Sequence, residues 1–471
     1  MQLNGVDGMY EVIHECRICG SKELAKYLNF GLMPLANAYI DPKIKQQEYG
    51  FPLEVLFCKN CALSQLSIVV APKIMFSNYA YHSSISRTFR EHCSRMADTV
   101  KKMLKTESPF VVDIASNDGC LIREFKKKNF RVVGVEPAGN LAAIANKEGL
   151  KTIVEFWNRE VAERIKQEMG GADAITATNV FAHVHDVKSF IKDANYLLKD
   201  DGVLIIEVPY GLNLIKRNEF DTIYHEHLSY FLVKPLQVLF SNEGMELRDV
   251  QEVPIHGGTI RVFATKKENK LIPKNAANVD ELLGREKEEG LYSVDAYNEF
   301  VKNLLDIKIE LLKLLAKLKR EKKRIAAYGA SAKGNTLLNY CGINSNLVDF
   351  IVDDTPEKQD KLYAGNHIPI FGREELERQK PDYLIILAWN FSGEIMEKTK
   401  KFSEHGGKYI IPIPEVRVVA ADSFSQVSTL SKLPRATFSK KVVTKGGFSP
   451  TFSKKVEGEA GFSPTFSKKV V

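Results

Sequence analysis

Long apolar runs are absent from this sequence of 471 residues. No stretch reaches the roughly 18 consecutive apolar residues that a membrane-spanning helix needs. The N-terminus also lacks the basic-then-apolar layout of a signal peptide. We therefore expect a cytoplasmic protein that has no membrane partner.

A basic excess is missing from most of the chain as well. The formal net charge is +7, but the last 41 residues account for all of it, with nine Lys and Arg side chains against two Glu. A nucleic-acid binder usually carries its basic residues on the folded surface, so we expect no nucleic-acid partner. The charged end repeats the motif TFSKKV from Thr437, Thr451 and Thr465, and its composition predicts a disordered tail over residues 421–471.

Cysteine is scarce, and four of the seven cysteines form two Cys-x-x-Cys pairs, Cys16 with Cys19 and Cys58 with Cys61. In a reducing compartment such pairs favour metal binding over disulfides, and four thiolates are common ligands of a structural zinc ion. Glycine after the first pair suits the left-handed position that follows such a turn, whereas alanine follows the second. We predict a zinc-binding domain over residues 1–75, with four free thiols or a redox pair as the alternatives.

The length and the 44% hydrophobic content predict more than one core, because a single core stops growing at roughly 250 to 300 residues. After a helical connector over residues 76–105, strand-like and helix-like runs alternate, beginning with FVVDIA, CLIREFKKKN and RVVGVE. One of these helices should end at Gly202, and the run IRVFATKK should close the sheet. The alternation predicts a doubly wound α/β, Rossmann-like domain over residues 106–266.

A charged helical segment over residues 267–322 follows and is expected to pack two domains together. A second series of strand-like and helix-like runs then extends from RIAAYGAS to KYIIPIP. This series predicts a C-terminal Rossmann-like domain over residues 323–420.

The first loop of the central domain, VVDIASNDG, lacks the three glycines with which a dinucleotide-binding loop approaches a pyrophosphate. Its two aspartates disfavour a diphosphate and favour the ammonium and sulfonium groups of S-adenosylmethionine. Glu136 ends the next strand, where it can bind both ribose hydroxyls. The predicted cofactor site comprises Asp113, Ser116, Asn117, Asp118, Gly119, Glu136 and Asn179. No Tyr-x-x-x-Lys follows the strand near Asn179, which argues against an NAD-dependent sugar dehydratase or epimerase.

The second loop, AAYGASAKGNTLLNY, contains Gly329, Ser331 and Lys333 and no acid, and a helix is expected to begin there. A helix N-terminus with a lysine favours an anion. Asp353 ends the next strand, where a sugar hydroxyl could be held. We predict a nucleotide diphosphate at this loop, and the alternative is a glycine turn that only lets helix and strand pack.

A cluster of proton-handling side chains, Tyr224, His225, Glu226 and His227, follows the strand-like run VLIIEVPY. Ligands of open α/β sheets bind beyond the carboxyl ends of the strands, so the cluster is placed as an active-site loop. The alternatives are a second metal site formed by the two histidines and a structural cluster inside a packed turn.

In order along the chain, the cysteine pairs and eight further motifs resemble the three-domain sugar C-methyltransferases that act on nucleotide-linked keto-deoxysugars. The motifs are AYHSS, DIASNDG, GVEPA, NVFAHVHD, IEVPY, YHEHLSYF, HGGTIR and YGASAKGNTLL, and the resemblance covers about residues 14–420. It implies a zinc domain, a class I S-adenosylmethionine domain and a C-terminal domain that helps to hold a nucleotide-diphosphate sugar. The sequence does not specify the sugar.

The resemblance also implies roles for individual residues. His227 would be the base that removes a proton from the carbon beside a keto group, and Glu226 would orient it. Tyr224 and His183 would bind the enolate, and Tyr81 would reach over the sugar. His256 and Arg261, in HGGTIR, are further candidates for contact with substrate or phosphate. A methyltransferase acting on oxygen or nitrogen, and a non-catalytic docking protein with zinc knuckles, are the alternative functions.

Overall fold

The computed structural model describes residues 8–44, 47–76, 83–85, 87–255 and 257–420. The predictions for Tyr81, His256 and the tail 421–471 lie outside these residues. In the part of the chain that is described, no helix is long and apolar enough to cross a membrane.

An antiparallel four-stranded sheet forms the N-terminal part of the chain. Its order is β12-β5-β4-β2, with strands β2 (Leu24–Met33), β4 (Phe51–Cys58), β5 (Ser64–Leu66) and β12 (Ser229–Tyr230). Buried and half-buried residues alternate along β4, as expected for a strand with one face on a core. Nearby lie the paired strands β1 (Tyr10–Val12) and β6 (Ile68–Val70) and the short helix α1 (Pro72–Phe76). The edge strand β12 comes from far along the chain, directly after the Tyr224–His227 cluster.

The central sheet has seven strands in the order β13-β14-β11-β10-β7-β8-β9. They are β7 (Phe110–Ile114), β8 (Arg131–Val135), β9 (Thr152–Ile153), β10 (Ala172–Thr178), β11 (Leu198–Pro209), β13 (Met245–Val253) and β14 (Thr259–Lys266). Strands β11, β10, β7, β8 and β9 pair in parallel. Strand β14 pairs antiparallel with β11, and β13 pairs antiparallel with β14. This sheet confirms the predicted doubly wound α/β class.

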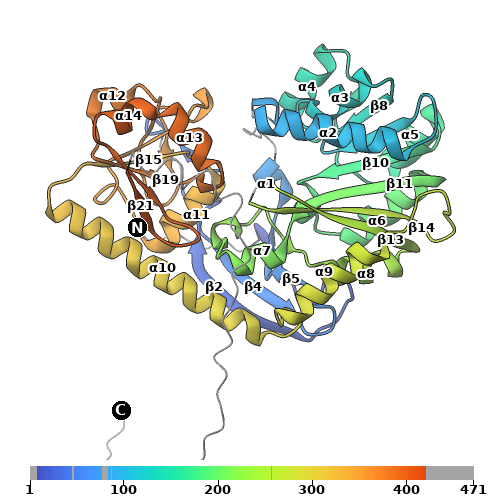
Figure 1. The fold of residues 1–471 in the computed structure, drawn as a ribbon, viewed down its shortest axis with the longest axis horizontal. Coiled ribbons are helices and arrows are strands. Elements are labelled where there is room, and N and C mark those ends of the chain that lie inside the picture. Colours follow the sequence, from blue (N-terminus) through green and yellow to red (C-terminus); the bar gives the residue numbers. More distant parts are fainter. Residues whose placement is uncertain (1–7, 45–46, 77–82, 86, 256, 421–471) are drawn as a thin grey trace, which may run out of the picture. The chain divides into compact units, whose positions relative to one another are not determined.

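Helices cover both faces of the central sheet, and Figure 1 shows α2 and α6 on opposite sides of β10 and β11. The helices are α2 (Arg87–Met103), α3 (Cys120–Lys127), α4 (Gly139–Lys147), α5 (Arg159–Met169), α6 (Val187–Leu197), α7 (Gly211–Lys216) and α8 (Val233–Asn242). Phe89 and Phe125 of α2 and α3 pack with Val111 in one buried cluster, while Ile191 of α6 packs with Val112 in another. Adjacent residues of β7 thus serve opposite faces, as the two-residue period of a strand requires.

Two predicted helices differ from those observed. The helix expected to end at Gly202 ends at Leu197, and β11 begins at once, because Leu198 pairs with Ala172 of β10. Gly202 packs so closely that a Cβ there would lie 2.9 Å from the carbonyl oxygen of Ala172. The charged segment after β14 forms two helices, α9 (Ala276–Glu288) and α10 (Asp295–Arg320), separated by a turn with Gly290 at φ 70°.

A second, six-stranded sheet with the order β18-β16-β15-β19-β20-β21 forms the C-terminal part (Figure 1). Its strands are β15 (Ile325–Tyr328), β16 (Phe350–Val352), β18 (Ile370–Phe371), β19 (Tyr383–Ile386), β20 (Lys408–Ile411) and β21 (Arg417–Val419). The helices are α11 (Ala332–Cys341), α12 (Glu375–Gln379), α13 (Ser392–Lys398) and α14 (Lys400–Glu404). The parallel pairs β15–β16, β15–β19 and β19–β20 confirm the predicted Rossmann-like character. A separate pairing of β17 (Leu362–Tyr363) with β3 (Tyr39–Ile40) ties this part to the N-terminal segment.

Candidate active site and zinc centre

The four cysteines of the two Cys-x-x-Cys pairs come together in one cluster. Their sulfur atoms all lie within 4.8 Å of one another, with Sγ–Sγ distances of 3.5 Å between Cys16 and Cys61 and 3.6 Å between Cys19 and Cys58. A tetrahedral zinc ion with Zn–S bonds of about 2.3 Å needs sulfur atoms about 3.8 Å apart. The cluster therefore fits a structural zinc ion, and it is the one group of metal-ligand side chains found among the described residues.

The two cysteine turns have the same backbone geometry. The amide of Gly20 donates to the carbonyl of Cys16, and the amide of Ala62 donates to that of Cys58, both at 2.9 Å. Gly20 has φ 70° and Ala62 has φ 65°, so the alanine adopts the left-handed conformation expected only of the glycine. The second turn thus places a residue with a Cβ in the left-handed region, which costs some backbone strain.

A cavity of about 760 Å³ lies at the carboxyl ends of strands from both Rossmann-like sheets. From the central sheet it is lined by Asp113, Ser116, Asn117, Glu136, Asn179, His183, Tyr224 and His227. From the C-terminal sheet it is lined by Gly329, Ser331, Lys333, Asp353 and Lys358. The structure thus brings most of the predicted cofactor, catalytic and substrate residues to one cavity.

Glu136 is the acid that shapes the first loop. Its carboxylate accepts hydrogen bonds from the amides of Asn117 at 2.9 Å and Ala138 at 2.8 Å. Ala115, Asn117 and Gly119 all have positive φ, which gives the loop its tight winding around the end of β7. Glu136 lies at the cavity wall, where its carboxylate has further lone pairs for ribose hydroxyls.

Two acids at this end of the cavity resist ionisation when the site is empty. Burial raises the pKa of Asp113 to about 7, partly offset by a 2.6 Å hydrogen bond from the hydroxyl of Thr176. Burial also raises the pKa of Glu136, and its two amide donors oppose that rise. A ligand with a positive charge would stabilise both carboxylates. The residues therefore fit the cationic S-adenosylmethionine.

Asp118 and Gly119, the other predicted cofactor residues, are placed differently. The carboxylate of Asp118 accepts hydrogen bonds from the amide and hydroxyl of Ser84, at 3.0 and 2.5 Å, and neither Asp118 nor Gly119 lines the cavity. Asn117 makes the parallel contact, since its Oδ1 accepts from the amide of Ser83 at 3.0 Å. The SND part of the loop thus holds the segment that enters α2.

His227 is oriented through both ring nitrogens. Nδ1 lies 2.8 Å from the carbonyl oxygen of Thr222, and Nε2 lies 2.8 Å from the hydroxyl of Tyr224. A carbonyl only accepts, so Nδ1 carries the proton, and Nε2 in the neutral ring is the acceptor. The ring of His183 packs edge-on against that of His227, with centroids 4.9 Å apart. Burial lowers the pKa of His183 to about 4, so this side chain is neutral at ordinary pH.

The other two members of the cluster contact the N-terminal part of the chain. Glu226 accepts a 2.6 Å hydrogen bond from the amide group of Asn37. His225 is buried with Nε2 at 3.3 Å from the carbonyl oxygens of Phe51 and Pro52. Burial lowers the pKa of His225 to about 4. His225 therefore packs on the N-terminal sheet, whereas His227 lines the cavity, and the two do not form a second metal site.

The residues that follow β15 place a lysine with a buried ammonium and a capped helix N-terminus at the wall of the cavity. Ser331 caps α11 by accepting from the amide of Gly334 at 3.2 Å, and Gly329 has φ 92°. The ammonium of Lys333 lies 5.0 Å from the ring centre of Trp389 and makes no hydrogen bond to any described residue. Asp353, which directly follows β16, accepts from the amide of Ala330 at 2.7 Å and so lies against this loop, at the strand end where the sequence placed it.

Sequence reasoning missed some of the polar residues that line the cavity, and Arg261, like Asp118 and Gly119, was predicted for the site but does not line it. Asn37, Tyr39 and Lys358 line the cavity, and Lys358 bonds the carbonyl of Ala330 at 3.0 Å. Asn37 and Tyr39 belong to the zinc domain, and no motif in their surroundings marked them. Arg261 does not line the cavity, because its Nε pairs with the buried carboxylate of Glu207 at 2.6 Å.

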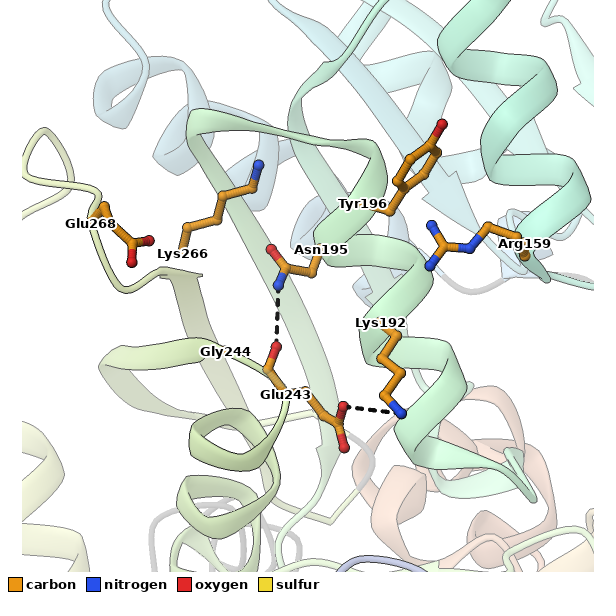
Figure 2. Close-up of a pocket in the computed structure, with 8 residues that line it drawn as sticks. All are labelled: Arg159, Lys192, Asn195, Tyr196, Glu243, Gly244, Lys266 and Glu268. Atoms are coloured by element: carbon orange, nitrogen blue, oxygen red, sulfur yellow. Dashed lines mark hydrogen bonds and ion pairs between the residues drawn. The ribbon is translucent and has the colours of Figure 1, made fainter.

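A smaller hollow of about 400 Å³ lies between α6 and the end of β14 (Figure 2). Its cations are paired: Arg159 with Asp193 at 3.1 Å and Lys192 with Glu243 at 3.7 Å. The amide of Asn195 donates to the carbonyl of Glu243 at 3.1 Å, as Figure 2 shows. None of the predicted site residues lies there, and the ion pairs are those of a solvated surface.

Three family models match successive parts of the chain. A zinc binding domain matches residues 16–76, a methyltransferase domain matches residues 87–250, and a C-methyltransferase C-terminal domain matches residues 254–414.

Among curated proteins, the chain is 37% identical over 415 residues to the C-methyltransferase NovU of Streptomyces niveus, covering 87% of this chain and 98% of that protein. Among solved structures, the magnesium protoporphyrin IX methyltransferase of Synechocystis with bound SAM overlaps 38% of this chain and 79% of its own, with 10% identity and a TM-score of 0.30. A possible histamine N-methyltransferase of Thermotoga maritima overlaps 38% of this chain and 91% of its own, with 21% identity and a TM-score of 0.30. The match to NovU along nearly all of its length, together with the four-cysteine centre, shows that this chain belongs to the zinc-containing, S-adenosylmethionine-dependent C-methyltransferases.

Proposed function

We propose that this C-methyltransferase acts on a nucleotide-diphosphate-linked keto-deoxysugar, by removing a proton from the carbon beside the keto group. The observation that carries the proposal is the single cavity, because a base cluster, an acidic loop and a lysine-bearing loop all line it. We retain the predicted division into domains 1–75, 106–266 and 323–420, joined by segments 76–105 and 267–322, as part of this proposal.

The central domain would hold the cofactor. Asp113 and Asn179 would bind its amino-acid end, and Glu136 would accept hydrogen bonds from the ribose. When bound, S-adenosylmethionine supplies an electrophilic methyl group attached to a sulfonium. The two carboxylates would be ionised beside that positive charge, which favours binding.

His227 would be the base. The carbonyl of Thr222 keeps the proton on Nδ1, which leaves the Nε2 lone pair at the cavity wall beside the Tyr224 hydroxyl. In the reaction, the C–H proton goes to Nε2 and its electron pair moves toward the keto oxygen, which becomes an enolate. The imidazolium formed is stabilised by the same carbonyl that orients the neutral ring.

Neutral hydrogen-bond donors suit the enolate oxygen. The Tyr224 hydroxyl would turn from Nε2 to the keto oxygen when the substrate binds, which frees the single Nε2 lone pair to take the C–H proton. His183, kept neutral by burial, would donate a second hydrogen bond. Tyr81 and Glu226 are proposed to position the sugar and the base segment.

The C-terminal loop would hold the diphosphate. Lys333 has no hydrogen-bond partner among the described residues, and Ser331 begins a helix whose N-terminus faces the cavity. Gly329 lets the backbone approach the ligand, and Asp353 would accept a hydroxyl of the nucleotide or sugar. His256 and Arg261 are weaker candidates for contact with the substrate or its phosphate groups, because the Arg261 guanidinium already pairs with the Glu207 carboxylate.

The test is His227→Ala with His405→Ala, an exposed histidine of the C-terminal part, as the matched control. Loss of the base should lower methyl transfer by about 100-fold or more, while the cofactor dissociation constant stays within about twofold of wild type. Product mass spectrometry with labelled methyl donor and a panel of keto-deoxysugar nucleotides measures turnover, and calorimetry measures cofactor binding. Loss of cofactor binding in His227→Ala, or label on an oxygen or nitrogen atom, would refute the proposal.

A further inference from the structure

Arg17 lies inside the first zinc turn, between Cys16 and Ile18, yet its side chain contacts the catalytic segment. It is buried, with 8% of its surface exposed. Its Nη1 donates to the carbonyl of Leu228 at 3.0 Å and to that of Leu66 at 3.3 Å. A residue flanked by zinc ligands thus binds the residue that directly follows His227.

Leu228 is the point at which three parts of the chain meet. Its amide donates to the carbonyl of Ala182 at 2.8 Å, beside His183. Its carbonyl accepts from the amide of Leu66 at 3.0 Å as well as from Arg17. The next two residues form β12, which pairs with β5 of the N-terminal sheet. The positions of His183 and His227 therefore both depend on Leu228.

Arg17 forms no ion pair with a carboxylate of the described residues, although Arg stays charged when buried. Among the groups that act on its charge, Cys16 contributes more than Glu11, which acts through space without an ion-pair contact. A zinc ion with four thiolates carries two net negative charges, and Cys16 is adjacent to Arg17. The zinc centre can thus supply the negative charge that a buried cation requires.

We propose that Arg17 is a positioning residue that couples the zinc centre to the catalytic segment from Tyr224 to Tyr230. The thiolate centre holds the guanidinium, and the guanidinium holds the Leu228 carbonyl. The catalytic consequence rests on the proposed role of His227, whereas the coupling itself does not. Zinc then has two effects in this protein, since it stabilises the N-terminal fold and also fixes the backbone that carries the base.

The second zinc turn provides a matched control. Lys59 follows Cys58 as Arg17 follows Cys16, but Lys59 is exposed. Arg17→Met and Lys59→Met therefore each remove one cation at the same place in a Cys-x-x-Cys turn. Only the first variant removes the contact with Leu228.

Hydrogen exchange of the full-length zinc protein, read by mass spectrometry, tests the coupling without any substrate. Arg17→Met should raise exchange of peptides covering residues 224–231 by roughly tenfold, because a hydrogen bond from a charged donor is lost. Peptides of β15 and β16 should be unchanged, and so should every peptide of Lys59→Met. Unchanged exchange over 224–231 in a folded, zinc-loaded Arg17→Met protein would overturn the proposal.

The rate of zinc release to a chromogenic chelator tests the proposed electrostatic interaction between Arg17 and the zinc-binding thiolates. Arg17→Met should release zinc at least about threefold faster than wild type, because the thiolates lose a buried counter-charge, and Lys59→Met should not, because an exposed charge is screened. Equal rates in the two variants would contradict the link. If Arg17→Met does not fold, Arg17→Lys replaces it. The lysine side chain keeps the charge but ends one bond short of the Nη1 position from which both carbonyls are reached. Faster exchange over 224–231 is therefore still expected, and wild-type exchange would refute the proposal.

Turnover distinguishes positioning from a general loss of structure. With a substrate that the wild type methylates, Arg17→Met should lower kcat per cofactor-binding site by about tenfold and leave the cofactor dissociation constant unchanged. A fall in cofactor-binding sites with an unchanged kcat per site would show a merely structural role. Because exchange and zinc release need no substrate, failure of the proposed sugar substrate would leave this result intact.

Discussion

The loop after β7 and the loop after β15 occupy equivalent places in their two sheets, yet they present opposite charge to one cavity. Beside the first lie Asp113, in β7, and Glu136, directly after β8, and burial opposes the ionisation of both. Directly after the second lies Lys333, in the first turn of α11, whereas nearby Lys358 is paired with Asp353 at 3.3 Å. A Rossmann-like sheet therefore supplies a place for a ligand, while the few side chains at the strand ends determine which charge that ligand carries.

The backbones of the two loops differ accordingly. The first places Ala115, Asn117 and Gly119 at positive φ and uses amides to hold Glu136. The second uses one positive-φ glycine and a serine cap at the start of a ten-residue helix. Amides turned toward a carboxylate are not available to a phosphate, whereas a helix N-terminus is. Removing one charged side chain beside either loop tests this difference.

The largest effect is expected from Glu136→Ala, with exposed Glu155→Ala, at the end of the neighbouring strand β9, as the control. Glu136 would bind two ribose hydroxyls and also holds two loop amides, so the cofactor dissociation constant should rise by about 100-fold. Calorimetry with S-adenosylmethionine measures it. An equal, small change of the dissociation constant in both variants would show that Glu136 does not face the cofactor.

Lys333→Ala should affect the other ligand. Loss of its ammonium should raise KM for the nucleotide sugar by about tenfold and leave cofactor affinity unchanged. Lys400→Ala removes an exposed lysine that pairs only within its own helix, and it should change neither quantity. Weaker cofactor binding in Lys333→Ala would contradict the separation of the two loops.

The smallest effect is a pH dependence of cofactor binding. The pKa of Asp113 is about 7 in the empty protein, so below this pH the side chain is protonated and must lose its proton when a cation binds. The affinity should therefore rise with pH, by about fivefold from pH 6 to pH 7 and by less than about twofold from pH 7 to pH 8. Calorimetry in buffers of different ionisation enthalpy should detect the released proton. Asp113→Asn should remove the pH dependence, and its persistence in that variant would assign the proton to another group.

The sequence was sufficient for the parts of the fold that repeat a local pattern. FVVDIA, RVVGVE and DAITATNV form adjacent parallel strands, and the four cysteines meet as their spacing predicts. The course of residues 198–202 was not predictable, because Leu198 leaves the helical pattern only by pairing with Ala172 of a neighbouring strand. Tertiary pairing overrides local helix propensity there.

Side-chain direction was the least predictable feature of the site. Asp113 and Asp118 look equivalent in the sequence, but only Asp113 lines the cavity, because the Asp118 carboxylate accepts hydrogen bonds from Ser84 instead. The Asp118 side chain points away from the cavity because residues 117 and 119 both have positive φ, and the backbone between them turns its carboxylate toward α2. Asn37 lies 189 residues from its partner Glu226, and such a contact leaves no local signal in one sequence.

Strand β12 has a consequence for protein engineering. Because Ser229 and Tyr230 complete a sheet whose other strands come from residues 24–66, the N-terminal portion is not an interchangeable cassette. A hybrid enzyme could take its first part from one relative and its remainder from another. Strands β5 and β12 would then come from different proteins and would not match where they pair beside the catalytic segment. Successful recombination should require both pieces of that sheet to be inherited together.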